Sequence, residues 1–140
     1  MSGNNSEIGR ILGELGTIRV TYELSSKGWD VFRQINEVGF DLLVRKGLRS
    51  YLVEVKSRDL IRSQGKNAKY VTVGRSKAQQ KRSDFLAVYL YGPGTCFMIP
   101  SALPIVAQSK SRNSISLGKW ENNEFSPREE FLPYIEKFDI

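Results

Sequence analysis

The segment from residue 40 to residue 58, FDLLVRKGLRSYLVEVKSR, constrains the fold more than any other part of the chain. Asp41 stands at the start of one run of strand-forming apolar residues, and Glu54 and Lys56 interrupt a second run. A lone carboxylate in the buried part of a sheet loses hydration worth several kcal/mol, so it has to be paired or to hold a cation. The segment therefore predicts two adjacent strands that carry a polar site.

The spacing within the segment predicts that these three side chains lie together. Side chains alternate across a strand, so Glu54 and Lys56 share one face of the second strand. Asp41 precedes Glu54 by thirteen residues, and the intervening RKGLRS has the length of a hairpin turn. If the two strands pair, Asp41 and Glu54 point into one notch, where they repel each other unless a divalent cation lies between them. The apolar run from Phe40 to Val44 also predicts a strand that is covered on both faces.

The residues before and within this segment predict a helix followed by three strands. Apolar residues recur at helical spacing over residues 6–27, with Ser6 as the N-cap and Gly28 as the stop. Three glycines inside this helix, Gly9, Gly13 and Gly16, each cost about 1 kcal/mol relative to alanine, so we expect the helix to approach a sheet closely. Residues 29–34, 40–46 and 49–57 are rich in β-branched and aromatic residues and are separated by short glycine-containing loops, which is typical of consecutive strands.

The rest of the chain predicts further strands with helices between them. We expect a short edge strand at residues 70–73, a polar helix at 76–84, and a hairpin whose strands flank a GPG turn and rejoin the sheet. A weaker strand is expected at residues 114–117. Ser126, Pro127 and Glu129 form a capping-box pattern that predicts a final helix, which Pro133 should interrupt or kink. The expected fold is a single α/β domain over residues 1–140, with a mixed central β-sheet and flanking helices.

The composition excludes several classes of chemistry. The chain has no histidine, which removes the commonest general base, the usual zinc ligand and any catalytic triad that needs imidazole. Metal binding would rest on oxygen ligands, which favour hard cations such as Mg²⁺. The single cysteine, Cys96, excludes an internal disulfide framework, and no apolar run is long enough to cross a bilayer. We therefore expect a soluble intracellular protein, either cytoplasmic or nucleoid-associated.

Positive charge is concentrated in one part of the chain. The whole chain has a formal net charge of +6, while twelve basic and two acidic residues give residues 45–82 a charge of +10. Such a stretch is typical of a surface that binds a phosphate backbone, although a solvated basic surface would have the same composition. The candidate DNA-binding residues are Arg58, Arg62, Lys66, Lys69, Arg75 and Lys77.

Four short motifs follow one another along the chain: a helix with Glu14, then Gly39-Phe40-Asp41, then Glu54-Val55-Lys56 on a strand, then a helix with Gln79 and Gln80. This pattern resembles the PD-(D/E)XK nuclease superfamily. Its short spacing is similar to that of small members, the archaeal-type Holliday junction resolvases and the intron-encoded homing endonucleases. The resemblance spans roughly residues 7 to 100. Phe40 stands where the motif has proline, a position that is commonly loose in the superfamily.

The resemblance implies a restriction-endonuclease-like αβββαβ core and a role for each motif residue. Asp41, Glu54 and the carbonyl of Val55 would coordinate Mg²⁺, for which Mn²⁺ can substitute. Lys56 would orient or help deprotonate the attacking water and would stabilise charge on the scissile phosphate. Glu14 would reach the site from the first helix, with Glu7 as its competitor. Gln79 would join from the later helix, with Gln80 as its equal.

The implied activity is metal-dependent hydrolysis of phosphodiester bonds in DNA by an endonuclease. A binding module that keeps the fold and the basic groove without cleaving is the alternative, and an unrelated α/β domain with an accidental Glu-x-Lys is a third. Cleavage of both strands would favour a homodimer or a higher homo-oligomer. The GPG hairpin and the apolar residues Phe131, Ile135 and Phe138 are candidate interfaces, although core packing explains the latter group equally well.

Overall fold

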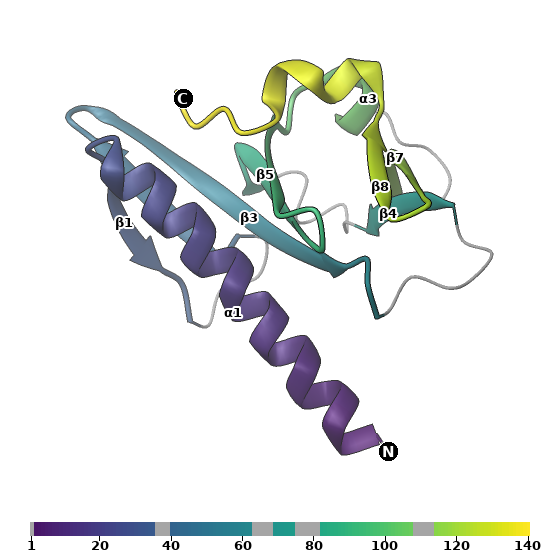
Figure 1. Ribbon diagram of the computed structural model, residues 1–140. Helices are drawn as coiled ribbons and strands as arrows, with labels where there is room; N and C mark the ends of the chain where they lie inside the picture. Colours follow the sequence, from purple (N-terminus) through teal and green to yellow (C-terminus); the bar gives the residue numbers. More distant parts are fainter. Residues whose placement is uncertain (1, 36–39, 63–68, 75–81, 108–113) are drawn as a thin grey trace.

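The computed structural model describes residues 2–35, 40–62, 69–74, 82–107 and 114–140 (Figure 1). Its main sheet has five strands in the order β1-β2-β3-β5-β6. These strands are β1 (Asp30–Arg33), β2 (Leu42–Lys46), β3 (Arg49–Asp59), β5 (Phe85–Tyr91) and β6 (Thr95–Pro100). β3 and β5 are parallel and the other neighbours are antiparallel, so the predicted mixed sheet, its three consecutive strands and the GPG hairpin are confirmed.

The helix α1 (Ser2–Ser26) packs across β3 and ends where the sequence predicted. Gly28 has φ +91°, and the Trp29 N–H donates to the Leu24 carbonyl at 3.1 Å, which closes the helix in a Schellman motif. Trp29 and Leu24 are both buried in one core, as this cap favours. The helix begins at Ser2, so the prediction that Ser6 is its N-cap is wrong.

The close approach of α1 to the sheet occurs at Gly16. A Cβ built on this residue would overlap Ser57 Oγ of β3 and would touch Tyr89 Cβ of β5 at 3.4 Å. A Cβ on Gly9 or Gly13 would meet nothing within 4 Å, so packing explains only one of the three helical glycines. No described residue offers Ser57 Oγ a hydrogen bond, although that atom is buried.

A second, smaller sheet lies on the other side of the main sheet. It consists of β4 (Tyr70–Gly74), β7 (Ser114–Glu121) and β8 (Glu124–Pro127) in the order β4-β7-β8, all antiparallel. The predicted edge strand is therefore present as β4, at the edge of this small sheet. The weaker strand predicted at 114–117 is longer and has a partner, β8, that the sequence did not reveal.

The prediction of a final α-helix capped by Ser126 is wrong. Ser126 and Pro127 belong to β8, and the segment after them forms the 3₁₀ helix η1 (Glu129–Tyr134), which has no side-chain cap. Pro133 lies in the last turn of this helix, and the chain beyond Tyr134 is not helical. A short helix, α3 (Pro104–Ala107), packs near η1 in the same layer (Figure 1).

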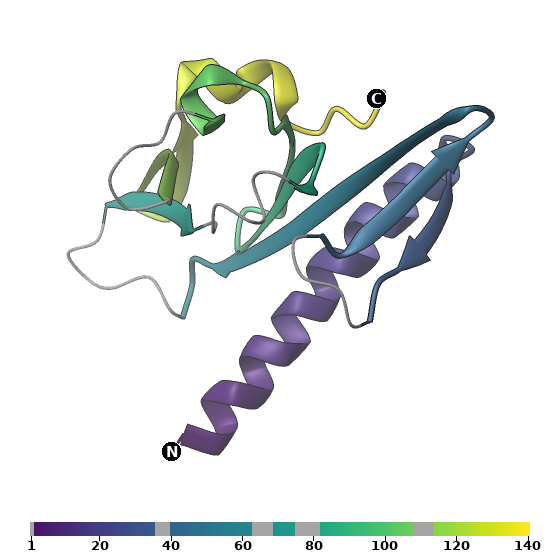
Figure 2. The same cartoon turned by 180° about the vertical axis from the view of Figure 1, so that it is seen from behind.

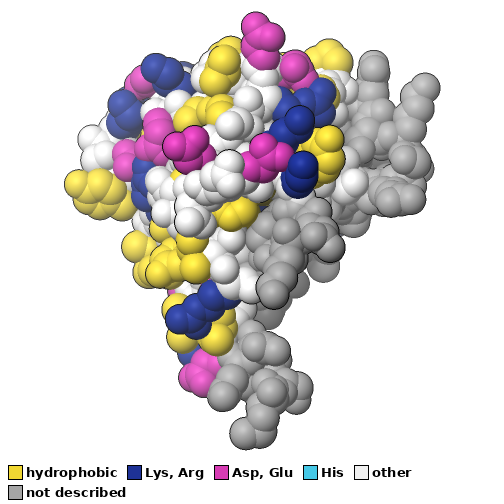
Figure 3. Space-filling model, turned by 45° about the vertical axis from the view of Figure 1, so that its right-hand side comes forward, with side chains coloured by type: hydrophobic (Ala, Val, Ile, Leu, Met, Phe, Trp, Pro, Cys, Tyr) yellow, Lys and Arg dark blue, Asp and Glu magenta, His cyan; other side chains and the backbone are white. Residues whose placement is uncertain are grey.

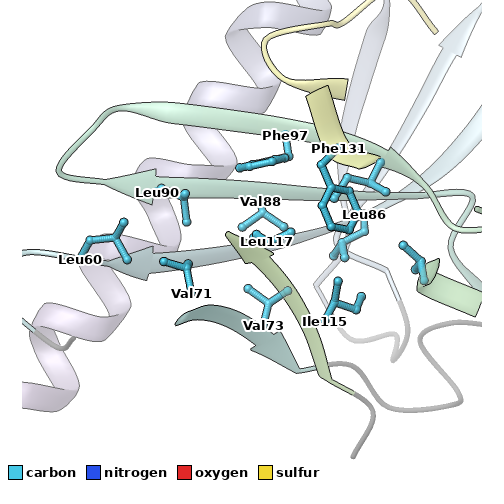
Figure 4. Close-up of a cluster of buried hydrophobic side chains, with 12 residues drawn as sticks. Leu60, Val71, Val73, Leu86, Val88, Leu90, Phe97, Ile115, Leu117 and Phe131 are labelled. Carbon is cyan, nitrogen blue, oxygen red and sulfur yellow. The ribbon is translucent and has the colours of Figure 1, made fainter. Parts of the chain in front are cut away.

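Two cores lie on opposite faces of the main sheet. On one face, Val20 and Leu24 of α1 pack against β2, β3 and β6. On the other face, the small sheet and Phe131 pack against Leu86 and Val88 of β5 (Figure 4). β5 is therefore covered on both sides, which explains its uninterrupted apolar sequence. β2 is covered on one side only, with Leu43 37% exposed, so the predicted two-sided burial of this strand is wrong.

The residues that follow η1 tie α1 to β6. Ile135 forms a β-bridge with Phe97, and the backbone N–H of Glu136 donates to the Cys96 carbonyl at 2.8 Å. The Glu136 carboxylate accepts the Cys96 N–H at 2.7 Å and pairs with Arg19 of α1. Phe138 is buried with Leu24, and Phe131 is buried in the opposite core, so the two phenylalanines act in core packing.

The polar helix predicted at 76–84 falls largely on residues 75–81, outside the described part of the chain. In the described residues, no helix combines the length and the apolar character that a bilayer crossing requires.

We predict that Gly16→Ala destabilises the protein and that adding Ser57→Ala reverses the loss. The new methyl group overlaps Ser57 Oγ, and overpacking of this kind costs about 1–3 kcal/mol. Without that oxygen the methyl group meets ordinary contacts, and alanine gains about 1 kcal/mol over glycine inside a helix. Urea unfolding of the double-mutant cycle measures the coupling. Gly13→Ala is the control and is expected to lose nothing, and additive effects of Gly16→Ala and Ser57→Ala would contradict the close contact.

Candidate active site

The site begins where β2 stops pairing with β3. β2 starts at Leu42, whose partner in register is Val53, while β3 continues to Asp59. Asp41 lies just before β2, and its backbone N–H donates to the Val53 carbonyl at 2.8 Å. The Asp41 carboxylate accepts the N–H of Val55 at 2.7 Å, which is the donor that β2 would otherwise have bonded. Asp41 is exposed, so this carboxylate lies at an open edge of β3.

Glu54 lies beside this edge and is almost completely buried. Its side chain is 1% exposed, and its partner in register on β5 is the core residue Leu86. Lys56 Nζ lies 3.6 Å from Glu54 Oε2, with the lysine side chain 33% exposed. A buried carboxylate is tolerated when a cation compensates its charge, and the lysine provides that compensation from the solvent side. The structure thus brings Glu54 and Lys56 together, as the alternation of the strand predicted.

The backbone of Val55 adds a third oxygen. The N–H and C=O groups of one strand residue point to the same side, so the Val55 carbonyl points toward the edge where Asp41 bonds its N–H. Two carboxylates and a carbonyl form a donor set that suits a hard divalent cation. The described residues contain no cluster of three or more His, Cys, Asp or Glu side chains, so side chains alone do not enclose an ion there.

Glu14 pairs with Arg33, a residue that the sequence did not identify as part of the site. Its carboxylate accepts hydrogen bonds from Arg33 of β1 at 2.7 and 3.0 Å, in a two-pronged geometry. The hydrogen bond to Arg33 lowers the pKa of Glu14, and the same bond raises the pKa of Arg33. The negative charge of Asp41 also raises the pKa of Arg33, because Arg33 pairs in register with Leu42, the residue after Asp41. Arg33 is therefore bonded to Glu14 and is also influenced by the charge of Asp41.

A signal for Arg33 was present in the sequence. Arg33 lies one residue before the end of the first predicted strand, and an antiparallel neighbour places the end of one strand beside the start of the next, where Asp41 lies. The competitor Glu7 has its carboxylate 3.9 Å from Arg10 of the same helix, and both side chains are mostly exposed.

The described DNA-binding candidates lie in different settings. Arg58 donates to the Thr72 carbonyl at 2.8 Å and so connects β3 to β4. Arg62 is exposed in the turn after β3, and Lys69 is exposed with its Nζ 3.4 Å from the Glu121 carboxylate. Gln79, with its competitor Gln80, and the basic residues Lys66, Arg75 and Lys77 lie outside the described residues.

Two solved structures share this arrangement of strands and helices. The bacterial homing endonuclease I-Ssp6803I aligns with 91% of this chain and 86% of its own at 17% sequence identity, with a TM-score of 0.66. The chain shares the fold of this nuclease. Hjc, a Holliday junction resolvase from the archaeal hyperthermophile Archaeoglobus fulgidus, aligns with 74% of this chain and 83% of its own at 15% identity, with a TM-score of 0.55.

The restriction-endonuclease-like α/β fold that the motifs implied is thereby confirmed. No family model matches the chain, and no curated protein matches it in sequence. The similarity is therefore one of fold, and the chemistry depends on the residues at the edge of β3.

We predict that Arg33→Gln raises the pKa of Glu14 toward its ordinary value, because the hydrogen bond from Arg33 is the largest cause of the lowering. A lowered carboxyl pKa contributes stability at neutral pH that disappears as pH falls through that pKa. NMR titration of the Glu14 side-chain carboxyl measures the shift. Arg10→Gln is the matched control, because Arg10 acts on Glu14 only through its charge, and its shift is expected to be smaller. Equal shifts in the two variants would contradict the two-pronged bond.

Proposed function

We propose that the chain is a metal-dependent DNA endonuclease that hydrolyses phosphodiester bonds. The observation that carries this proposal is the gathering of Asp41, the buried Glu54 and Lys56 at the open edge of β3. The shared fold with a homing endonuclease and a junction resolvase supports it. The same three residues form the motif that the resemblance to PD-(D/E)XK nucleases rests on.

Asp41, Glu54 and the Val55 carbonyl would hold Mg²⁺, or Mn²⁺ in its place. When bound, such an ion lowers the pKa of water and offsets the charge of the phosphate. The water oxygen attacks phosphorus, one P–O ester bond breaks, the water loses a proton to solvent, and the leaving oxygen takes one up. Lys56, partly exposed beside Glu54, orients the water and offsets the negative charge that develops on the phosphoryl oxygens.

The exposed arginine that pairs with Glu14 has a place in the same scheme. Arg33 is 56% exposed, and Glu14 holds its guanidinium from the side of α1. A guanidinium in this position can contact a phosphate oxygen of the bound strand. Glu14 then acts as a positioning residue for Arg33. Gln79 stays a proposed participant from the segment that follows β4.

The binding module is the second candidate, since a sheet edge with basic neighbours can bind DNA without cutting it. The two candidates differ in one measurement, nicking of plasmid DNA in Mg²⁺ or Mn²⁺ against EDTA. A panel of four-way junction, flap and linear duplex substrates then separates the roles named for the two similar structures. Because a cut in both strands needs two sites, we also propose a homodimer or a higher homo-oligomer.

We predict that Lys56→Ala lowers single-turnover cleavage by about two orders of magnitude or more, since a positioned charge of this kind is worth about 3 kcal/mol or more. DNA affinity is expected to survive, because one phosphate contact among many is lost. Asp41→Asn is also expected to abolish cleavage, but through weaker Mg²⁺ binding in calorimetry, with partial rescue by Mn²⁺. Lys119→Ala is the control, because its ammonium lies over the Tyr70 ring in the small sheet. Cleavage by Lys56→Ala at the wild-type rate would remove this lysine from the mechanism.

We predict that replacing Arg62, Lys66 and Lys69 together weakens DNA binding to all sequences alike. Each lost phosphate contact lowers the log-log salt slope by roughly 0.9 units. Fluorescence anisotropy across a salt series measures the slope. The control replaces Lys27, Lys119 and Lys137, which changes the net charge equally outside the basic segment. Identical slopes in the two triple variants would show that residues 45–82 do not form the groove.

A further inference from the structure

A hollow of about 280 Å³ lies between α1 and β1, which run side by side in both ribbon views (Figures 1 and 2). The described residues that line it are Thr17, Ile18, Thr21 and Tyr22 of α1 and Val31 and Arg33 of β1. Arg33 is the charged member of this set, and the others contribute methyl groups, hydroxyl groups and one aromatic ring. The hollow therefore suits a ligand that has a flat apolar face and a negative charge beside it.

Arg33 stands at the end of the hollow nearest the candidate active site. It pairs in register with Leu42, the residue that follows Asp41. Val31 lies two residues earlier in β1, or roughly 7 Å away along the strand. Stacked DNA rises about 3.4 Å per nucleotide on each strand. A base that belongs to a nucleotide within roughly two steps of a phosphate at Arg33 therefore reaches the hollow.

The guanidinium of Arg33 keeps donors for a ligand although it pairs with Glu14. An arginine has five N–H donors, and the Glu14 carboxylate accepts two hydrogen bonds from them, at 2.7 and 3.0 Å. The Arg33 side chain is 56% exposed, so a ligand can reach the other donors. Because the pair is neutral overall, a phosphate would bind Arg33 by directed hydrogen bonds and would gain little from long-range attraction.

Tyr22 offers an open aromatic face in the wall of the hollow. It is 68% exposed, and among the described residues no ring or guanidinium stacks on it. Phe32, the exposed aromatic residue of β1, already has the Arg45 guanidinium 5.7 Å from its ring centre. Every nucleic-acid base has a π-face, so an exposed ring of this kind binds bases with little regard to their sequence.

Thr17 supplies a hydrogen-bond acceptor for the edge of a base. Its hydroxyl group donates to the Gly13 carbonyl at 3.1 Å, so the hydroxyl oxygen is left to accept a bond from a ligand. The edges of the bases carry N–H donors that match such an oxygen. One acceptor does not distinguish the four bases, and we therefore expect a weak sequence preference.

Exposed apolar side chains alone do not single out this hollow. The space-filling view, from another side, shows apolar side chains along the projecting part of α1, interrupted by a few charged ones (Figure 3). A second hollow of about 190 Å³ lies at the ends of β3 and β5, and its wall contains Asp59 as well as Arg62. The hollow beside β1 differs because it combines a basic residue near the candidate active site with an open ring and a hydroxyl acceptor.

We propose that the hollow between α1 and β1 holds an unpaired base of the DNA strand that the site cuts, stacked on Tyr22, while Arg33 binds the adjoining phosphate. This inference rests on the proposed nuclease function and specifies its substrate as DNA with an unpaired nucleotide within roughly two steps of the cut. A base inside a duplex is paired and stacked, and its removal costs free energy that is smallest when the base is already unpaired. DNA with a single-stranded flap is therefore preferred over linear duplex.

Fluorescence anisotropy with two matched probes tests the proposal. The probes are a duplex with a single-stranded tail and the same duplex with abasic sites in the tail, both in EDTA so that no strand is cut. The wild type is expected to bind the tail with bases about fivefold or more tighter, which is the effect that one stacked base typically has. Tyr22→Ala is expected to lose this preference, and Tyr22→Phe, which keeps the ring, is expected to retain it.

The controls separate stacking from folding and from charge. Tyr22 is largely exposed, so its replacement leaves the core intact, and an unfolding curve checks this. Leu48→Ala is the matched control and is expected to keep the preference, because Leu48 is fully exposed in the turn between β2 and β3. Stacking releases no counterions, so the preference is expected to stay the same across a salt series while the overall affinity falls. A preference that disappears with rising salt would overturn the stacked base.

Photo-cross-linking tests the position of the base. A 5-iododeoxyuridine placed at each position of the tail in turn is expected to cross-link to the peptide that contains Tyr22 at one or two positions only. Cross-links confined to other peptides would overturn the proposal.

The outcomes distinguish this inference from the nuclease proposal. A wild type that binds both probes equally, or a Tyr22→Ala chain that keeps the preference, overturns the base site and leaves the proposed nuclease function intact. A wild type that binds no DNA overturns both.

Discussion

A carboxylate that is buried inside a sheet needs a compensating charge nearby. Glu54 is such a carboxylate, and the residues around it on β3 provide that charge. β3 pairs with β5 on one side, and on the other side its pairing with β2 ends at Val53. Glu54 therefore lies between the core residue Leu86 of β5 and the open edge of β3 at Val55. Lys56 compensates its charge from the solvent side at 3.6 Å. A residue that was buried only for packing would be apolar, since an apolar side chain stabilises such a position without a partner. The buried charge therefore supports the proposed site at this edge.

The sequence predicted this region well because its signals are local. Alternation fixed which residues of β3 share a face, and the short RKGLRS turn fixed the pairing with β2. The closing of α1 at Gly28 followed from the need for a left-handed residue at that cap. The resemblance to PD-(D/E)XK nucleases, and not a local pattern, singled out Glu14, and its partner could not be predicted from spacing. Arg33 reaches Glu14 only because β1 and α1 pack side by side in three dimensions.

The wrong prediction of a capped α-helix near the C-terminus has a different cause. Ser126, Pro127 and Glu129 match a capping box, yet β7 offers Ser126 and its neighbours a strand to pair with, and that tertiary partner outweighs the local preference. Likewise, Leu43 has the sequence of a residue in a fully covered strand, but the small sheet covers β5 and not β2. The sequence pattern shows which residues are apolar, and the topology of the fold determines which of them are buried. The same holds for the helix α1, where Ile18 and Tyr22 are apolar but remain exposed.

The segment after η1 has a consequence for how the chain reaches its folded state. Glu136 pairs with Arg19, 117 positions earlier, and Phe138 completes the core that Val20 and Leu24 of α1 begin. On a ribosome, α1 emerges before the strands that it packs against, and this side of the sheet closes only after almost the whole domain has been synthesised. Contacts of such long sequence separation slow folding and leave apolar surface exposed meanwhile. The core around α1 is therefore completed only after the last residues of this domain are synthesised.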